Sequence, residues 1–306
     1  MTLPFRHVPV LLRETIDACF TTATGNYVDA TGGGGGHTEE LLTRLSNNGK
    51  VLILDRDPQA IAVLNEKFSA DTRVIVVQER FGNLGKVLEM NGWKQIHGLI
   101  ADLGMSSEQV DSLDRGFSLR NLHAPLDLRM GLNTQTASEW LAIATIEEIA
   151  KALEVGGDFI HARQIAIPLK QAVLNNPELT IGEALEAGFG ANSARLPANV
   201  ISRFIQSLRI AVNDEYGELK SLLRCAREKV VIGGKVSVLS FHSGEAKIVK
   251  AEFTSLSKSD DPVRHSGERY WLPLKPVVAK TVRGEVARNP RASSAVLRSA
   301  VRGGVQ

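Results

Sequence analysis

The chain has 306 residues, of which 43% are hydrophobic and 23% are charged, and its formal net charge at pH 7 is +2. This composition is ordinary for a globular protein, excludes a polar low-complexity chain, and at this length suits one large domain or two interleaved domains. No apolar stretch approaches the roughly 20 residues of a membrane helix. Residues 1–10 show neither a basic start followed by a long apolar run nor a small-residue cleavage site, so we expect a cytoplasmic protein with no membrane partner.

The positive charge gathers toward the C-terminus. From Pro262 onward the chain has nine Lys or Arg residues against two acidic residues, so the preceding part is net negative. A basic segment of this kind is typical of proteins that bind a polyanion, although a solvated surface with extra arginines is the alternative. Cys19 and Cys225 are too few for a disulfide framework or a metal centre, and we expect no metal and two buried, inert thiols.

The N-terminal third of the chain alternates short apolar runs with helical patterns, which indicates a parallel sheet covered by helices. The predicted strands lie at residues 27–30, 51–55, 73–77 and 98–102. Helical patterns between them include residues 37–45 and 58–68, and the second of these has Pro58 in its first turn.

The middle of the chain differs, because residues 110–198 carry helical patterns and no convincing strand. Thr-x-x-Glu capping boxes predict that helices begin after Thr136, Thr145 and Thr180. Strand patterns return at 235–241, after a turn predicted at Gly233-Gly234, and at 277–282 and 295–301. We therefore predict an α/β domain made of residues 1–109 and 206–306, interrupted by an all-helical, substrate-recognising domain at 110–205.

Five glycines at residues 32–36 join the first predicted strand to the first predicted helix. An open α/β sheet binds its ligand at this turn, and glycines leave the backbone amides open to close approach. Asp55 ends the second predicted strand about 20 residues further on, where an acid can accept hydrogen bonds from a ribose diol. The combination predicts a cofactor that contains a nucleoside.

The glycine spacing decides which cofactor we expect. A dinucleotide fingerprint needs a third glycine three residues after the second, but His37 or Thr38 stands there, and the Gly-Lys-Ser/Thr ending of a P-loop is absent. S-adenosyl-L-methionine carries no phosphate, and Asp29 can serve its methionine end. We predict a class I S-adenosylmethionine-dependent methyltransferase fold, that is, a Rossmann-like α/β sheet with an inserted all-helical domain.

The fourth predicted strand ends at Asp102, beside the same crevice. A lone aspartate at a strand end often only caps a turn, but its place beside the glycine loop favours a function. The Asp/Ser-Pro-Pro-aromatic pattern that is common in DNA amino-group methyltransferases is absent here, which argues against those enzymes.

Over nearly its whole length the chain resembles the bacterial 16S ribosomal RNA cytosine-N4 methyltransferase family. Ordered blocks carry the resemblance: HVPVLL at 7–12, GGH at 35–37, LDRDP at 54–58, DLGMSSEQ at 102–109, RGFS at 115–118, PLDLRM at 125–130, RIAVN at 209–213, SFHS at 240–243 and NPR at 289–291.

The resemblance implies methylation of the exocyclic N4 of one cytidine in the decoding region, with S-adenosyl-L-methionine as cofactor and 16S rRNA or the small ribosomal subunit as partner. By motif position, the family's cofactor contacts fall on Gly35, Gly36, His37, Asp55, Phe81, Asp102 and Gln109, to which the glycine loop adds Gly34. The oligomeric state stays open, with a homodimer as one alternative.

Methyl transfer to N4 depends mainly on alignment, because a sulfonium is already a strong electrophile. An acceptor for the N4 proton would help, and our hypothesis assigns this role to Asp102, with Ser106 and His242 as its partners. The arginines expected at RNA phosphates are Arg203, Arg288, Arg291 and Arg298. Solvated or ion-paired arginines are the alternative.

Several blocks depart from the family pattern. The family has Gly-Glu-Glu where this chain has Gly156-Gly157-Asp158, and Ala-Thr-Arg-Thr-Phe-Gln where this chain has residues Ile201 to Gln206. It has Leu-Glu-Asp-Arg where this chain has Gly244-Glu245-Ala246-Lys247. In the family's Asn-Pro-Arg-Ala-Arg-Ser, the second arginine is replaced here by Ser293. The alternatives are therefore a paralogous RNA methyltransferase with another target and a non-catalytic, cofactor-binding ribosome assembly factor. A nicotinamide oxidoreductase is opposed by the incomplete fingerprint.

Overall fold

The computed structural model describes residues 9–106, 109–110, 113–131, 135–254, 270–274, 279–280 and 290–303. The chain divides into two compact units, which we call the sheet unit (residues 1–104 and 216–306) and the helical unit (residues 105–215). From the sequence, the helical domain is predicted to end at residue 205. That position lies inside helix α10 (Ala198–Asn213), all of which belongs to the helical unit.

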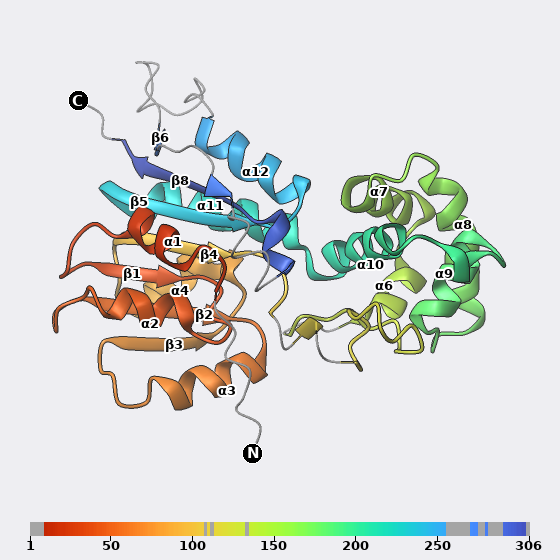
Figure 1. The fold of residues 1–306 in the computed structure, drawn as a ribbon, viewed down its shortest axis with the longest axis horizontal. Coiled ribbons are helices and arrows are strands. Elements are labelled where there is room, and N and C mark those ends of the chain that lie inside the picture. Colours follow the sequence, from red (N-terminus) through yellow and green to blue (C-terminus); the bar gives the residue numbers. More distant parts are fainter. Residues whose placement is uncertain are drawn as a thin grey trace. The chain divides into compact units, whose positions relative to one another are not determined.

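The sheet unit is built on one mixed sheet with the order β3-β2-β1-β4-β5-β8-β6 (Figure 1). A further short strand, β7, also pairs with β8. Neighbouring strands from β3 to β5 are parallel, whereas β8 is antiparallel to β5, β6 and β7. The strands are β1 (Asn26–Asp29), β2 (Lys50–Asp55), β3 (Val74–Gln78), β4 (Ile96–Asp102), β5 (Val230–Ser240), β6 (Trp271–Pro273), β7 (Ala279–Lys280) and β8 (Val296–Arg302). The predicted Rossmann-like α/β sheet with an inserted all-helical segment is confirmed.

Helices cover both faces of this sheet. Successive side chains of a strand point to opposite faces, and here the side chains on both faces are apolar and need to be buried. Along β2, Val51 and Ile53 join one apolar core, while Leu52 and Leu54 join the other. The first core includes α1 (Leu12–Cys19), α2 (Gly36–Leu42) and α3 (Pro58–Lys67). The second includes α4 (Leu84–Met90), α11 (Glu215–Lys229) and α12 (Ser243–Thr254). Burial on both faces explains why these strands read as continuous apolar runs.

Three acids end neighbouring parallel strands. Asp29, Asp55 and Asp102 are the last residues of β1, β2 and β4, and β1 lies between the other two strands. Parallel strands end at the same edge of a sheet, and a ligand of an open α/β fold binds where the strand order reverses direction. The fold therefore gathers these carboxylates at one carboxyl edge, which positions the candidate site.

The turn predicted at Gly233-Gly234 is wrong, because both residues lie inside β5. The pairing register of β4 with β5 shifts there, from Ile96 opposite Val230 to Gly98 opposite Lys235. Gly233 has a φ of 79°, which is a left-handed conformation that glycine adopts at strand irregularities. The glycine pair thus marks a bulge rather than the beginning of the strand.

The cysteines only partly match the expectation. Cys19 is fully buried, and burial raises the pKa of its thiol to about 12. Cys225 is only partly buried, although desolvation still raises its pKa to about 11. Both thiols are therefore protonated and unreactive near neutral pH.

The helical unit contains α6 (Ala137–Ile143), α7 (Ile146–Gly157), α8 (Ala162–Asn175), α9 (Ile181–Phe189) and α10, packed around one apolar core. The three predicted capping boxes are confirmed: Thr136, Thr145 and Thr180 each cap a helix, with a glutamate reaching back from the third position. Within its described residues, the strand-like pairing is a single bridge between Pro125 and Thr180. None of the described helices in the chain is long and apolar enough to span a membrane.

Candidate functional site

The glycine loop after β1 contains glycines with two different purposes. A Cβ on Gly32 would lie 2.5 Å from Ile53 Cγ2, and one on Gly35 would lie 2.7 Å from Phe68 Cε2, so packing requires these glycines. A Cβ on Gly33 or Gly34 would meet no described atom within 4 Å. Gly33 has a φ of 48°, a left-handed conformation that favours glycine, so its backbone explains the residue. Gly34 has no positive φ, so its backbone conformation does not require glycine.

Gly34 therefore has neither a packing nor a conformational reason to be glycine among the described residues. Bare backbone that faces open space at the carboxyl edge of a parallel sheet is where a ligand can approach the main chain closely. Gly36 is explained differently, because a Cβ there would overlap the ring of Pro9, and it begins α2.

Asp55 holds this loop in place. Its Oδ2 accepts a 2.8 Å hydrogen bond from the backbone amide of Gly33, and its Oδ1 accepts one of 2.8 Å from the amide of Asp57. Burial raises the pKa of this carboxyl above its ordinary value, against the opposing effect of these amides. Each carboxylate oxygen has a second lone pair, so Asp55 can still accept further donors from a ligand.

Asp29 lies deeper, with a side chain that is 1% exposed. Its Oδ2 accepts a 2.8 Å hydrogen bond from Thr38 Oγ1, and its Oδ1 accepts a 3.3 Å hydrogen bond from the amide of Thr31. Burial raises its pKa to about 7. Asp29 thus ties the end of β1 to the glycine loop and to α2, a structural role that the sequence did not indicate.

Asp102 combines an anchored backbone with a carboxylate oxygen that has no hydrogen-bond partner among the described residues. The amide of Asp102 donates a 2.7 Å hydrogen bond to Thr31 Oγ1, and Oδ2 lies 3.9 Å from Nδ1 of the buried His37. Oδ1 is buried and accepts no hydrogen bond from any described residue. Burial, followed by the charges of Asp29 and Glu245, raises the pKa of this carboxyl to about 8.

Asp29 and Asp102 lie on the same face of the sheet. Asp29 is paired with Ile100, and Asp102 follows Ile100 by two residues, so the alternation of strand side chains points both carboxylates to one side. Phe81 begins the short helix η1 (Phe81–Asn83) after β3, and its half-buried ring packs against the core that α4 and α11 share. The structure therefore brings Gly34, His37 and these side chains to one edge of the sheet unit.

His242 precedes α12, and its imidazole takes part in the cap of that helix. Glu245 Oε2 accepts hydrogen bonds from the amides of Phe241 (2.8 Å) and His242 (3.4 Å), and the Glu245 amide donates to His242 Nδ1 at 3.5 Å. This exchange is the reciprocal pattern of a capping box. Nε2 of the imidazole lies 3.2 Å from Glu245 Oε1, so both ring nitrogens face Glu245.

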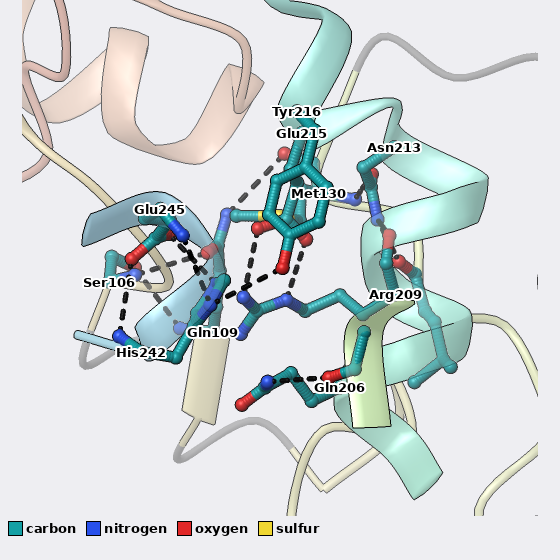
Figure 2. Close-up of polar contacts among 12 residues, drawn as sticks. Ser106, Gln109, Met130, Gln206, Arg209, Asn213, Glu215, Tyr216, His242 and Glu245 are labelled. Carbon is teal, nitrogen blue, oxygen red and sulfur yellow. Dashed lines mark hydrogen bonds and ion pairs between the residues drawn. The ribbon is translucent and has the colours of Figure 1, made fainter. Parts of the chain in front are cut away.

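Tyr216 also contacts this imidazole, with its hydroxyl 3.5 Å from His242 Nδ1 (Figure 2). A Cβ on Gly244 would overlap the Tyr216 hydroxyl. Gly244 is one of the departures from the family pattern, which has leucine there. Its missing side chain is what makes room for the tyrosine.

Ser106 and Gln109 belong to the helical unit and form a capping box of their own. The Ser106 amide donates to Gln109 Oε1 at 3.1 Å, and the Gln109 amide donates to Ser106 Oγ at 3.2 Å. Gln109 is 4% exposed, and its Nε2 also donates to the carbonyl of Met130 at 3.4 Å. Figure 2 shows this pair together with the buried ion pair of Arg209 and Glu215, whose hydrogen bonds are 2.7 and 2.8 Å long.

A profile described as the MraW methylase family matches residues 4–302 of the chain. The chain belongs to this family. The family resemblance inferred from the sequence blocks is thereby confirmed.

Curated relatives match nearly end to end. The Ribosomal RNA small subunit methyltransferase H of Dechloromonas aromatica is 38% identical over 310 residues, which cover 98% of this chain and 99% of that protein. The protein of the same name from Acidithiobacillus ferrooxidans is 40% identical over 312 residues, covering 97% and 95%. That of Nitrosococcus oceani is 39% identical over 307 residues, covering 96% of each.

The departures of the helical unit from the family pattern have a packing reason. A Cβ on Gly157 would lie 2.5 Å from a ring carbon of Phe159 and 3.0 Å from the carbonyl oxygen of Arg203, so α7 and α10 approach closely there. Gln206 Nε2 donates a 2.8 Å hydrogen bond to the carbonyl of Gly156 in the same contact. A glutamate at position 157 would not fit this arrangement.

The arginines expected at RNA are placed as follows. Arg203 is half-buried, with its guanidinium 5.2 Å from the ring centroid of Phe159. Arg298 is half-buried on β8; its Nη1 has no hydrogen-bond partner among the described residues, and burial lowers its pKa. Arg288 and the side chain of Arg291 lie outside the described part of the chain.

Proposed function

We propose that this chain uses S-adenosyl-L-methionine to methylate the exocyclic N4 of one cytidine in 16S rRNA of the small ribosomal subunit. The names of the curated relatives support a small-subunit rRNA substrate. The observation that carries the chemistry is Asp102, whose buried Oδ1 lacks a partner among the described residues, at the sheet edge that also holds the glycine loop.

The residues at this edge fit a methyl donor that contains adenosine. Gly33 and Gly34 leave room for close approach to the backbone, and Asp55 retains lone pairs for a ribose diol. We assign Phe81 to the adenine ring and Asp29 to the amino-acid end, directly or through water. S-adenosyl-L-methionine supplies, when bound, a methyl group on a sulfonium centre.

Asp102 would accept the proton that N4 loses on methylation. An amino group conjugated with a pyrimidine ring is a poor nucleophile, and an acceptor aligned with one of its protons localises the nitrogen lone pair and receives that proton. The carboxyl must be ionised for this role, and its raised pKa of about 8 keeps much of it protonated in the free protein at pH 7. A positive charge bound beside it favours the ionised form.

The helical unit and the C-terminal arginines would hold the RNA. A base in a folded RNA must leave its stack to reach an active site, so a second surface is needed to hold the neighbouring nucleotides. We assign this role to the helical unit, with Arg203 contributing from α10 and Arg298 from β8. Arg288 and Arg291 complete the proposed phosphate contacts.

Mass mapping of small-subunit RNA tests this function most directly. We expect RNA from a strain that lacks this chain to lose one N4-methylcytidine, and the restored wild-type protein to return it. An unchanged map would overturn the proposed target and favour a paralogue that methylates elsewhere. In a purified system, no tritium transfer from labelled cofactor to any RNA or small subunit, despite tight binding of S-adenosylhomocysteine, would favour a non-catalytic assembly factor.

A further inference from the structure

The loop that carries Phe81 is held by a helix that is distant in sequence. Glu218, in the first turn of α11, accepts a 2.8 Å hydrogen bond at its Oε2 from the backbone amide of Gly82. Its Oε1 lies 3.8 Å from Nη1 of Arg80. The Glu218 side chain is only 12% exposed, so water competes weakly for this carboxylate.

Gly82 is required for this contact. A Cβ at this position would lie 2.5 Å from Glu218 Oε2 and 3.1 Å from the Glu218 Cα, and the second of these distances involves backbone that cannot swing away. A second carboxylate holds the same loop from the other side, because Glu79 Oε1 accepts hydrogen bonds from the Arg80 amide (2.8 Å) and from Asn83 Nδ2 (3.1 Å). The backbone on both sides of Phe81 is therefore fixed by acidic side chains.

We propose that Glu218 is a positioning residue for the cofactor pocket, which holds Gly82 and thereby sets the place of the Phe81 ring against the adenine. This inference rests on the proposed function. Glu218 acts on the free protein, where it orders the loop before the cofactor arrives. Such pre-organisation removes part of the entropy that binding would otherwise lose, so it appears as cofactor affinity.

The alternative is that Glu218 has a purely structural role, and this role predicts different effects of substitution. A residue that only supports folding would lower the melting temperature without weakening cofactor binding by the folded protein. A residue that acts in the chemical step would lower kcat at saturating cofactor. The positioning role raises the cofactor Kd and KM and leaves kcat nearly unchanged.

Three variants of the full-length protein separate these roles. Glu218→Ala removes the acceptor of the Gly82 amide, Glu218→Gln keeps a neutral acceptor, and Gly82→Ala forces the loop away from the carboxylate. Glu228→Ala is the matched control, because Glu228 is exposed on the same helix. The measurements are the Kd of S-adenosylhomocysteine by calorimetry, the exchange rate of the Gly82 amide by NMR, the melting temperature, and kcat for tritium transfer to small subunits.

For Glu218→Ala and Gly82→Ala we expect the Kd to rise roughly tenfold, the factor that corresponds to one hydrogen bond with a charged group. Glu218→Gln should stay within about threefold of the wild type, since the amide oxygen still accepts the Gly82 hydrogen bond. The ion pair that is lost is long, at 3.8 Å, and its Arg80 side chain is 29% exposed. Gly82 amide exchange should accelerate in Glu218→Ala and not in Glu218→Gln, and kcat should change less than about twofold in both.

A wild-type Kd in Glu218→Ala would overturn the inference and leave the proposed function intact. An equal loss in Glu218→Gln and Glu218→Ala would also overturn it, because the amide keeps the hydrogen-bond acceptor. Failure of the wild-type protein to bind S-adenosylhomocysteine would instead overturn the proposed function. If Glu218→Ala does not fold, Gly82→Ala and Glu218→Gln carry the comparison.

Discussion

Thr31 joins the two acids that flank the glycine loop. Its hydroxyl accepts a 2.7 Å hydrogen bond from the amide of Asp102, and its own amide donates a 3.3 Å hydrogen bond to Asp29. The two carboxylates are thereby held on one face of the sheet, where the charge of Asp29 opposes ionisation of Asp102 and adds to the effect of burial on the Asp102 pKa. Activity and stability should therefore respond to substitution of these acids and to pH.

Replacement of Asp102 by Asn should separate binding from chemistry. We expect Asp102→Asn to lower the single-turnover rate of methylation, measured at saturating cofactor so that any loss of binding does not contribute, by at least roughly a hundredfold, since a positioned proton acceptor contributes about that much. Asp71→Asn, at the other end of the sheet before β3, is the control and should leave the rate unchanged. Methylation by Asp102→Asn at the parental rate would remove Asp102 from the mechanism.

The rate should depend on the ionisation of Asp102. Its raised pKa means that the carboxylate form is lost as the pH falls through about 8 in the free protein. We therefore expect kcat/KM to rise with pH and to level off above that value, with a slope near tenfold per pH unit on the acid side. A profile that is flat between pH 6 and 9 would contradict the assignment.

The buried Asp29 should make the folded protein less stable as the pH rises, which is the opposite of the usual behaviour of an aspartate. Its pKa of about 7 lies above the value of about 4 for an unfolded aspartate. Between these values the folded state binds more protons than the unfolded state, so its contribution to stability is lost as the pH rises, by at most about 1.4 kcal/mol per unit. In urea unfolding between pH 5 and 8, the stability of Asp29→Asn relative to the wild type should increase as the pH rises. A difference in the free energy of unfolding that does not change with pH would contradict this.

Two alanine substitutions in the glycine loop should have opposite effects. Gly34→Ala meets open space, so the free energy of unfolding should change by less than about 0.5 kcal/mol, while cofactor affinity falls. Gly32→Ala meets Ile53 and Leu64, so it should cost roughly 1–3 kcal/mol of stability. Denaturant unfolding and calorimetry on both variants test this, and unaltered affinity in Gly34→Ala would count against the ligand role of that backbone.

The packing of Tyr216 against Gly244 predicts a favourable double mutant. Gly244→Leu alone should destabilise the protein by roughly 1–3 kcal/mol because the new side chain overlaps the phenol. Tyr216→Ala vacates that space, so the combined variant should be more stable than the sum of the single changes predicts. Additive free energies of unfolding in this cycle would show that the two residues do not share one space.

Local patterns in the sequence determined much of the fold. The capping boxes at Thr136, Thr145 and Thr180 were predictable because both partners lie within one helical turn. Asp55 and Asp102 could be placed at strand ends because buried parallel strands are short apolar runs with a clear end. The order of the motif blocks was enough to identify the family.

Contacts between distant residues were decided only by the tertiary structure. Gly82 and Glu218 are 136 positions apart, and Thr31 and Asp102 are 71 apart, so no local periodicity relates them. The glycines at 233 and 234 form a bulge rather than a turn because the register of a neighbouring strand imposes it. Sequence patterns record what one helical turn or one strand requires. The strand order and the helices that pack on the sheet decide which of these side chains meet, because only packing in three dimensions brings them within hydrogen-bonding distance.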